Sequence, residues 1–185
     1  MARTEASPMV SRLILCHSAE LAADELAAVR ALMDAAFDDF TDHDWSHGLG
    51  GMHALVVDGD DVLAHGSLVM RRLLVEGRSL RCGYVEAVAT APTRRRQGHA
   101  TTVMTALEGL APAYDLLALS SSQRAQVFYA GRGWQPWRGP SSVMTPEGCV
   151  ATPEEDGAIL VLDRADSGLD LEAPITCDWR DGDVW

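Results

Sequence analysis

A basic, glycine-containing turn is the feature of this sequence with the clearest chemistry. Residues 85–90 read as an apolar strand, and three adjacent arginines (residues 94–96) precede Gly98, where a helix is expected to begin. Such a turn points several backbone N–H groups and the positive end of a helix dipole at one place, where they can hold a phosphate. The arginines add charge-assisted hydrogen bonds to the same anion. The sequence therefore predicts a site for a polyanionic cofactor.

The overall charge is opposite to that of the turn. The chain carries 15 basic and 27 acidic residues, a net charge of −12. Nucleic acid is disfavoured as the main ligand, because binding to its phosphates needs a basic face. A cationic substrate is favoured, since a cleft of one sign concentrates molecules of the opposite charge. Solubility alone also explains an acidic surface.

Length and composition indicate one domain. The chain has 185 residues, enough to bury a core, and no apolar run is long enough to span a membrane. Residues 1–9 lack the apolar segment of a signal peptide and are expected to be a flexible tail of a cytoplasmic protein. The four cysteines lie far apart, which predicts free thiols: Cys16, Cys82, Cys149 and Cys177.

No metal site is expected. His43, His47 and His53 invite a metal reading, since His43 and His47 are one helical turn apart, but intervening glycines and a missing glutamate break the zinc-protease pattern.

The elements that must position the turn follow from periodicity and turn residues. Strands are expected at residues 10–16, 52–57, 62–75, 78–90, 114–120 and 158–162, with another beginning at 134. Helices are expected after Ser18, acting as an N-cap, and at residues 98–110 and 123–130. Residues 38–45 read as a loop or broken helix, and residues 139–157 as turns. This order predicts the α/β class, as an α+β sandwich: a mixed, mostly antiparallel central sheet flanked by helices.

Two spaced motifs resemble the GCN5-related N-acetyltransferase (GNAT) superfamily: Arg95-x-x-Gly98-x-Ala100 and Tyr129-x-x-x-Gly133-Trp134. Ala100 stands where that superfamily more often has glycine. The resemblance implies the acyl-CoA N-acyltransferase fold, in which the turn holds the pyrophosphate of acetyl-CoA where two central strands splay apart.

Further segments resemble the aminoglycoside 2′-N-acetyltransferase family within that superfamily. They are Phe37-x-Asp39-Phe40-Thr41, Asp44-Trp45, Gly50-Gly51-Met52-His53-Ala54-Leu55, Arg81-Cys82-Gly83-Tyr84-Val85-Glu86, Leu119-Ser120-Ser121-Ser122 and Cys177-Asp178-Trp179-Arg180-x-Gly182-Asp183-Val184-Trp185. The resemblance implies acetyl transfer to the 2′-amino group of aminoglycosides such as gentamicin and tobramycin, hence antibiotic resistance, by a homodimer.

The cofactor is expected to lie against main chain. Backbone amides of residues 96–100 would meet the pyrophosphate, and Gly98 would allow close approach because it has no side chain. The strand before the turn would offer backbone groups to the pantetheine arm. The expected cofactor-binding residues are Val88, Ala89, Thr90, Arg95, Arg96, Gln97, Gly98, His99 and Ala100.

Two residues are candidates for proton transfer. Glu86 would take the proton of the substrate ammonium, directly or through water, and partial burial would raise its pKa toward working pH. Tyr129 would protonate the departing thiolate, as the superfamily position implies. An amide near Val88 would stabilise the oxyanion. An outward-facing strand glutamate and a core tyrosine are the structural alternatives.

The acidic segments are candidates for holding a flat polycation. Residues 177–185 would line the substrate site, with carboxylates on ammonium groups and tryptophan against sugar or cation. The family's substrate positions map onto Asp39, Glu86, Ser121, Glu155, Asp156, Asp183 and Trp185. Acetylation of another cationic amine (a polyamine, a cell-wall precursor or a protein amine) and a non-catalytic acyl-CoA- or drug-binding module remain the alternative functions.

Overall fold

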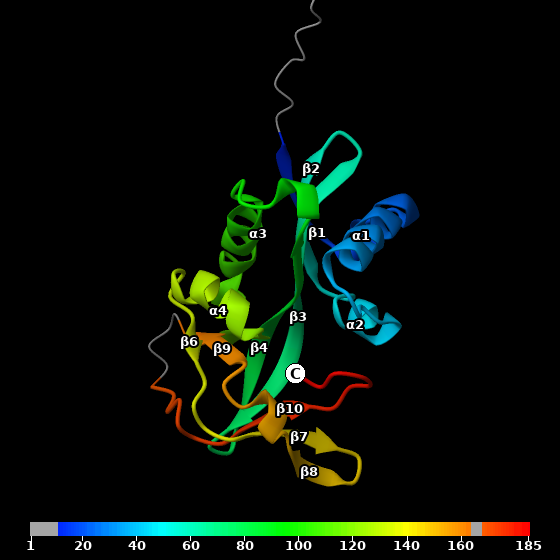
Figure 1. Ribbon diagram of the computed structural model, residues 1–185. Coiled ribbons are helices and arrows are strands. Elements are labelled where there is room, and N and C mark those ends of the chain that lie inside the picture. Colours follow the sequence, from blue (N-terminus) through cyan, green and yellow to red (C-terminus); the bar gives the residue numbers. More distant parts are fainter. Residues whose placement is uncertain (1–10, 164–167) are drawn as a thin grey trace, which may run out of the picture.

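The computed structural model describes residues 11–163 and 168–185, so the predicted tail at residues 1–9 lies outside the described residues. The strands are β1 (Arg12–His17), β2 (Met52–Asp58), β3 (Asp61–Val75), β4 (Arg78–Thr90), β5 (Leu116–Ser120), β6 (Gln135–Pro136), β7 (Ser141–Thr145), β8 (Gly148–Ala151), β9 (Ile159–Leu162) and β10 (Ile175–Asp178). These described strands form one sheet in the order β6-β9-β5-β4-β3-β10-β7-β8, and β2 joins β1 to β3 (Figure 1). Only the pairs β4–β5 and β7–β10 are parallel.

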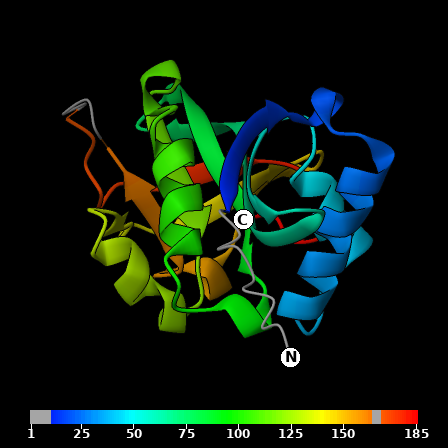
Figure 2. The ribbon, with the colours of Figure 1, turned by 90° about the horizontal axis from the view of Figure 1, so that it is seen from above.

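Helices cover both faces of the sheet. They are α1 (Ala23–Ala36), α2 (Asp42–His47), α3 (His99–Glu108) and α4 (Gln123–Ala130), with short 3₁₀ turns at Ser18–Glu20, Pro92–Arg94, Ala111–Ala113 and Pro153–Glu155. Viewed from above, α1 and α2 lie on one side of the sheet and α3 and α4 on the other (Figure 2). The predicted α+β sandwich is therefore confirmed. None of the helices in the described residues has the length and apolar content needed to cross a membrane.

The meander β2–β3–β4 forms where alternating apolar strands are joined by tight turns. A turn at Gly59 joins β2 to β3, and a turn at residues 76–77 joins β3 to β4. Helix α3 packs the buried side chains of Val103, Met104 and Leu107 against one face of this meander. The strand expected at residues 78–90 has the predicted bounds, because the turn before it and Pro92 after it are both strong local signals.

The two central strands separate part-way along their length. Strands β4 and β5 pair only from Cys82–Leu116 to Tyr84–Ala118. Beyond that point the register between β3 and β4 shifts, and Ala87 has a φ of 49°. An extra residue in the left-handed region is the mark of a β-bulge, which bends its strand. The bulge thus lies where β4 leaves β5, as expected for the fold.

A chain of hydrogen bonds between buried side chains reaches the bulge. The Ala87 carbonyl can only accept, so His65 Nδ1, 3.1 Å away, donates to it. His65 Nε2 then accepts from His53 Nδ1 at 2.8 Å, which leaves His53 Nε2 to accept from the Ser18 hydroxyl at 2.7 Å; the Gly51 carbonyl, 3.1 Å from the same hydroxyl, is its alternative acceptor. The Gly50 amide donates to Ser18 at 2.9 Å. Both imidazoles are 1% exposed and neutral in this arrangement.

Several expected elements were wrong in detail. Ser18 does not cap α1; the N-cap is Ala22, and Ser18 belongs to the histidine chain instead. The strand expected from residue 134 is only β6, since Trp134 and Trp137 turn into the core. Residues 139–157, expected as turns, contain the hairpin β7–β8. Strand β10 was not predicted, because its four residues are too short for a periodic signal.

The histidine chain predicts a specific loss of stability in acid. Burial lowers the pKa of His53 to about 4 and that of His65 to about 3, from an ordinary value of 6.5. Below pH 6.5 the unfolded chain binds protons that the folded chain does not, so the free energy of unfolding should fall by several kcal/mol as the pH falls to about 4. Urea titrations at a series of pH values measure this slope.

The variant His65→Gln removes one titrating ring while keeping a donor for Ala87, so its slope should be distinctly shallower. The control His43→Gln replaces an exposed histidine of α2 and should keep the original slope. Equal slopes in all three proteins would contradict the assignment.

Candidate active site

A groove of about 480 Å³ lies between the diverging strand and the basic turn. It is lined by the end of β4, the start of α3, the end of α1 and Phe128 of α4. The expected cofactor residues that line it are Val88, Ala89, Thr90, Arg95, Arg96, Gly98, His99 and Ala100. Gln97, also expected there, lies exposed in the same turn but is not among the lining residues.

The turn fits an anionic group. Gly98 is the N-cap of α3 with a φ of 86°, and a Cβ at this residue would meet no protein atom within 4 Å. Open space is therefore directly in front of the helix N-terminus, where N–H groups converge. His99 Nε2 faces no hydrogen-bond partner in the described part of the chain. Arg95 and Arg96 are exposed and have no salt-bridge partner among the described residues, so their charge is available to a diphosphate.

A second, smaller pocket of about 190 Å³ adjoins the groove at the bulge. Glu86 and Ala87 line this pocket, whereas Val88 to Thr90 line the groove. The remaining lining residues come from α2 and its approach, the end of β5 and the segment after β10: Phe40, Asp44, His47, Ser120, Ser121, Ser122, Arg180, Asp183 and Trp185. The single strand β4 thus passes from one cavity to the other within three residues.

Glu86 is held by an ion pair. Its side chain is 14% exposed, and Oε1 accepts a hydrogen bond from Nη1 of Arg180, a residue to which sequence reasoning gave no role. Burial raises the pKa of Glu86, and the Arg180 guanidinium opposes that rise. Glu86 therefore points into the pocket with a carboxylate, not outward from the strand. The same pocket brings Glu86 together with Ser121, Asp183 and Trp185, as predicted.

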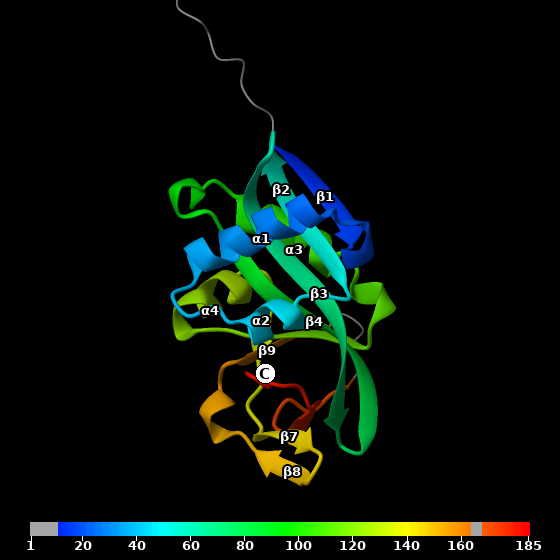
Figure 3. The ribbon, with the colours of Figure 1, turned by 90° about the vertical axis from the view of Figure 1, so that its right-hand side faces the viewer.

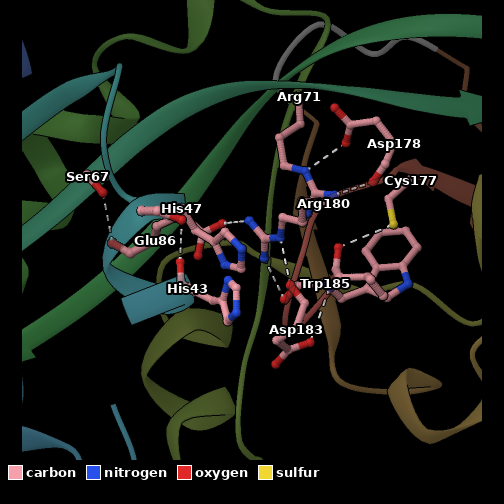
Figure 4. A network of polar contacts seen from close by, with 12 residues as sticks. His43, His47, Ser67, Arg71, Glu86, Cys177, Asp178, Arg180, Asp183 and Trp185 are labelled. Carbon is pink, nitrogen blue, oxygen red and sulfur yellow. Dashed lines mark hydrogen bonds and ion pairs between the residues drawn. The ribbon is translucent and has the colours of Figure 1, made fainter. Parts of the chain in front are cut away.

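The segment after β10 is fastened at several points (Figure 4). His47 Nε2 of α2 donates to the Asp181 carbonyl at 2.7 Å. Gly182, with a φ of 78°, lies so close to α2 that an added Cβ would be 2.7 Å from the His43 Cβ. Trp185 is 3% exposed, and its Nε1 donates to Thr152 Oγ1 at 2.9 Å. Figure 3 also shows this C-terminal segment next to α2.

Comparison with known families identifies the fold. The model of the acetyltransferase (GNAT) domain matches residues 18–137. The chain belongs to the GNAT acetyltransferase family. An aminoglycoside 2′-N-acetyltransferase of Mycolicibacterium fortuitum is 49% identical over an alignment of 176 residues, and the match covers 92% of this chain and 90% of that protein.

Solved GNAT structures share the fold at low sequence identity. The acetyltransferase YhbS of Escherichia coli, in complex with CoA, matches 95% of this chain and 93% of its own, with a TM-score of 0.66 and 16% identity. A GCN5-related N-acetyltransferase of Kribbella flavida matches 73% of this chain with a TM-score of 0.56 and 19% identity. The match covers only 36% of that longer protein.

Tyr129 of the acetyltransferase is nearly buried at the end of α4. It is 8% exposed and packs edge-on against Phe128 and Trp134, with ring centroids 5.2 and 6.0 Å away. Burial raises its pKa to about 12, so the phenol keeps its proton at neutral pH. Tyr129 is not among the residues lining either cavity, although its neighbour Phe128 lines the groove. Its role as an acid stays a prediction.

Three predicted acceptor residues lie outside the lining of the small pocket. Glu155 is next to it, since Ser120 Oγ donates to its Oε2 at 3.3 Å, and burial raises its pKa. Asp39 is exposed on the loop before Phe40. The Oδ1 atom of Asp156 accepts hydrogen bonds from the amide and hydroxyl of Ser141, which makes it an anchor of β7.

Trp185 lines the small pocket and also packs in a hydrophobic cluster of the core, where it is 3% exposed. Its predicted contact with a sugar or cation stays a prediction. Trp179, the other tryptophan of the segment expected to line the substrate site, is 47% exposed and does not line the pocket. In residues 11–163 and 168–185, no three His, Cys, Asp or Glu side chains are grouped to hold a metal ion.

The groove assignment of the acetyltransferase predicts unequal effects of two matched substitutions. Gly98 and Gly59 both have positive φ, and at neither would an added Cβ meet an atom within 4 Å. Gly98→Ala and Gly59→Ala should each cost about 1–2 kcal/mol of stability through backbone strain. Only Gly98→Ala places its methyl group in the groove, so only it should raise the dissociation constant for CoA, by about tenfold or more.

Isothermal calorimetry measures the affinity and thermal unfolding measures the strain. Equal CoA affinity in the two variants would place the diphosphate elsewhere.

Proposed function

We propose that this protein transfers the acetyl group of acetyl-CoA to the 2′-amino group of aminoglycosides. The 49% identity to the Mycolicibacterium fortuitum enzyme over most of both chains supports this substrate class. The observation that carries the proposal is the meeting of two cavities at residues 86–88, one suited to a diphosphate and one lined by carboxylates. An amine in the second cavity and a thioester in the first would both lie next to the same three residues of strand β4.

The residues supply each proton transfer that the reaction needs. Glu86 accepts the proton that the amine loses as its nitrogen bonds to the acetyl carbonyl carbon. The Val88 amide donates to the carbonyl oxygen as negative charge builds on it. As the carbon–sulfur bond breaks, the Tyr129 phenol would donate the proton that sulfur takes; Tyr129 would then regain a proton from solvent as Glu86 releases its own. Acetyl-CoA supplies the activated acyl group when bound along β4.

The acceptor wall suits a polycation. Asp183 and Asp44 line the pocket with Glu86, and Glu155 adjoins it through Ser120. Several carboxylates around a small volume attract ammonium groups and raise their local concentration. Asp39, which is exposed and precedes Phe40 in sequence, would meet parts of a substrate that extend beyond the pocket.

We further propose that residues 1–185 work as one domain in a cytoplasmic homodimer, as the family resemblance implies. Acetylation removes a positive charge that aminoglycosides use on ribosomal RNA, so the activity would protect the cell from the drug. Gel filtration with light scattering tests the dimer, and drug susceptibility of cells expressing the protein tests the protection.

The first prediction for this activity concerns Glu86. Release of CoA thiol should be seen with tobramycin and gentamicin, and NMR of the product should place the acetyl group on the 2′-nitrogen. Glu86→Gln should lower kcat by about 10²–10⁴-fold, because the base is lost, while leaving CoA affinity unchanged. The exposed Glu147 of the β7–β8 turn gives the control Glu147→Gln, which should behave like the parent protein.

Kanamycin-type drugs with a 2′-hydroxyl should not be acetylated. Robust N-acetylation of such a drug would favour a different amine as the target, and absence of thiol release with all aminoglycosides would refute the proposed function.

The second prediction separates two aspartates that the sequence treated alike. Asp183→Ala removes a carboxylate from the pocket and should raise KM for tobramycin roughly fivefold. This change corresponds to the loss of about 1 kcal/mol of binding free energy, as expected for one exposed ion pair. Asp156→Ala removes the partner of Ser141 and should lower stability by about 1–3 kcal/mol without changing KM. Steady-state kinetics and thermal unfolding distinguish the two outcomes; the reverse pattern would contradict the assignment.

A further inference from the structure

Arg180 is the arginine that lines the acceptor pocket, and each of its guanidinium nitrogens is engaged. Nη1 donates to Glu86, Nε donates to the Asp183 carbonyl at 2.8 Å, and Nη2 donates to the Trp185 carbonyl at 2.9 Å. The guanidinium carbon also lies 5.6 Å from the ring centroid of Tyr84. Figure 4 shows the side chain between Glu86 and the segment after β10.

These contacts hold the Arg180 guanidinium in one defined position, unlike a mobile charged side chain on the surface. The side chain is 14% exposed, and a planar guanidinium with three fixed donors matches its acceptors in only one orientation. The Tyr84 ring, which is 0% exposed, packs against the guanidinium. A lysine offers one point charge and could serve only part of this set.

The surroundings of Glu86 make a positive charge necessary. The charged and titratable groups that face it are Arg180 and Asp183 after β10, Arg71 of β3, Tyr84 of β4, and Asp44 and His47 of α2. Arg71 donates to Asp178 from Nε and Nη2 at 2.8 Å, while its buried Nη1 has no partner in the described residues and makes no hydrogen bond to Glu86. Arg180 alone bonds the Glu86 carboxylate among the described residues. Without it, burial and Asp183 would favour protonated Glu86, and the charge of Arg71 would remain to oppose them.

We propose that Arg180 is a positioning residue for acetyl transfer: it holds the Glu86 carboxylate ionised and in place, and joins it to the acceptor wall at residues 183–185. The inference rests on the proposed role of Glu86 as the base. One guanidinium then positions both the Glu86 carboxylate and residues 183–185, so that neither can move without the other. A cationic acceptor binds against the remaining carboxylates while Arg180 keeps Glu86 charged and ready to take its proton.

The test separates the charge of Arg180 from its shape. In Arg180→Ala, kcat/KM at pH 7 should fall about a hundredfold, because removal of one partner leaves the other charge buried and uncompensated. The acid limb of its pH–rate profile should move up by about one pH unit or more, since the pKa of Glu86 rises. Millimolar guanidinium ion should restore part of the activity. Arg180→Lys should keep the acid limb near its original pH but raise KM for the aminoglycoside.

The exposed pair Arg138–Glu172 supplies the control, and Arg138→Ala should leave the profile unchanged. Circular dichroism and CoA affinity establish that each variant is folded. The ¹³C shift of the Glu86 carboxyl carbon, titrated by NMR, reports its pKa even where turnover is absent.

A wild-type protein that acetylates no aminoglycoside would refute the proposed function, and the NMR titration would still decide the role of Arg180. An active wild type with the same acid limb, Glu86 titration and KM in all Arg180 variants would overturn the inference alone.

Discussion

The active site depends on one local constraint, the bulge in β4 that sets Ala87 at a positive φ. A regular strand would alternate its side chains and stay paired to β5, leaving no opening between them. The bulge ends that pairing and directs residues on either side of it into different cavities. Left-handed backbone is costly for alanine, so the surrounding structure must hold it. The histidine chain that ends on the Ala87 carbonyl is part of that support.

Charge is distributed to match the two halves of the reaction. Arg95 and Arg96 of the turn are exposed, have no salt-bridge partner among the described residues and line the groove proposed for the diphosphate. The small pocket is acidic, but Arg180, which also lines it, donates to Glu86 and to the carbonyls of Asp183 and Trp185. A polyanion and a polycation can therefore approach neighbouring sites of one small protein, although the chain as a whole carries a net charge of −12.

Sequence reasoning succeeded where signals are local and failed where they are not. The turn at residues 94–98 and the strand before it could be placed because proline and glycine mark their ends. Glu86 was selected from that strand by the family resemblance, not by a local signal. Arg180 lies in a motif that was recognised, yet its partner is 94 residues away, so no local pattern marks it. His53 and His65 stand in apolar strands and read as isolated polar residues. Asp156 and Asp183 look alike in sequence and differ only in what folds against them.

The direction of the histidine chain has an electronic consequence. Every donor in it, from the Gly50 amide through Ser18 and His53 to His65, points toward the Ala87 carbonyl. That carbonyl and the Val88 amide are two ends of the same peptide group. A hydrogen bond accepted at the oxygen draws electron density from the nitrogen, and aligned bonds reinforce one another. The chain therefore makes the N–H of Val88, a residue that lines the groove, a more polar donor.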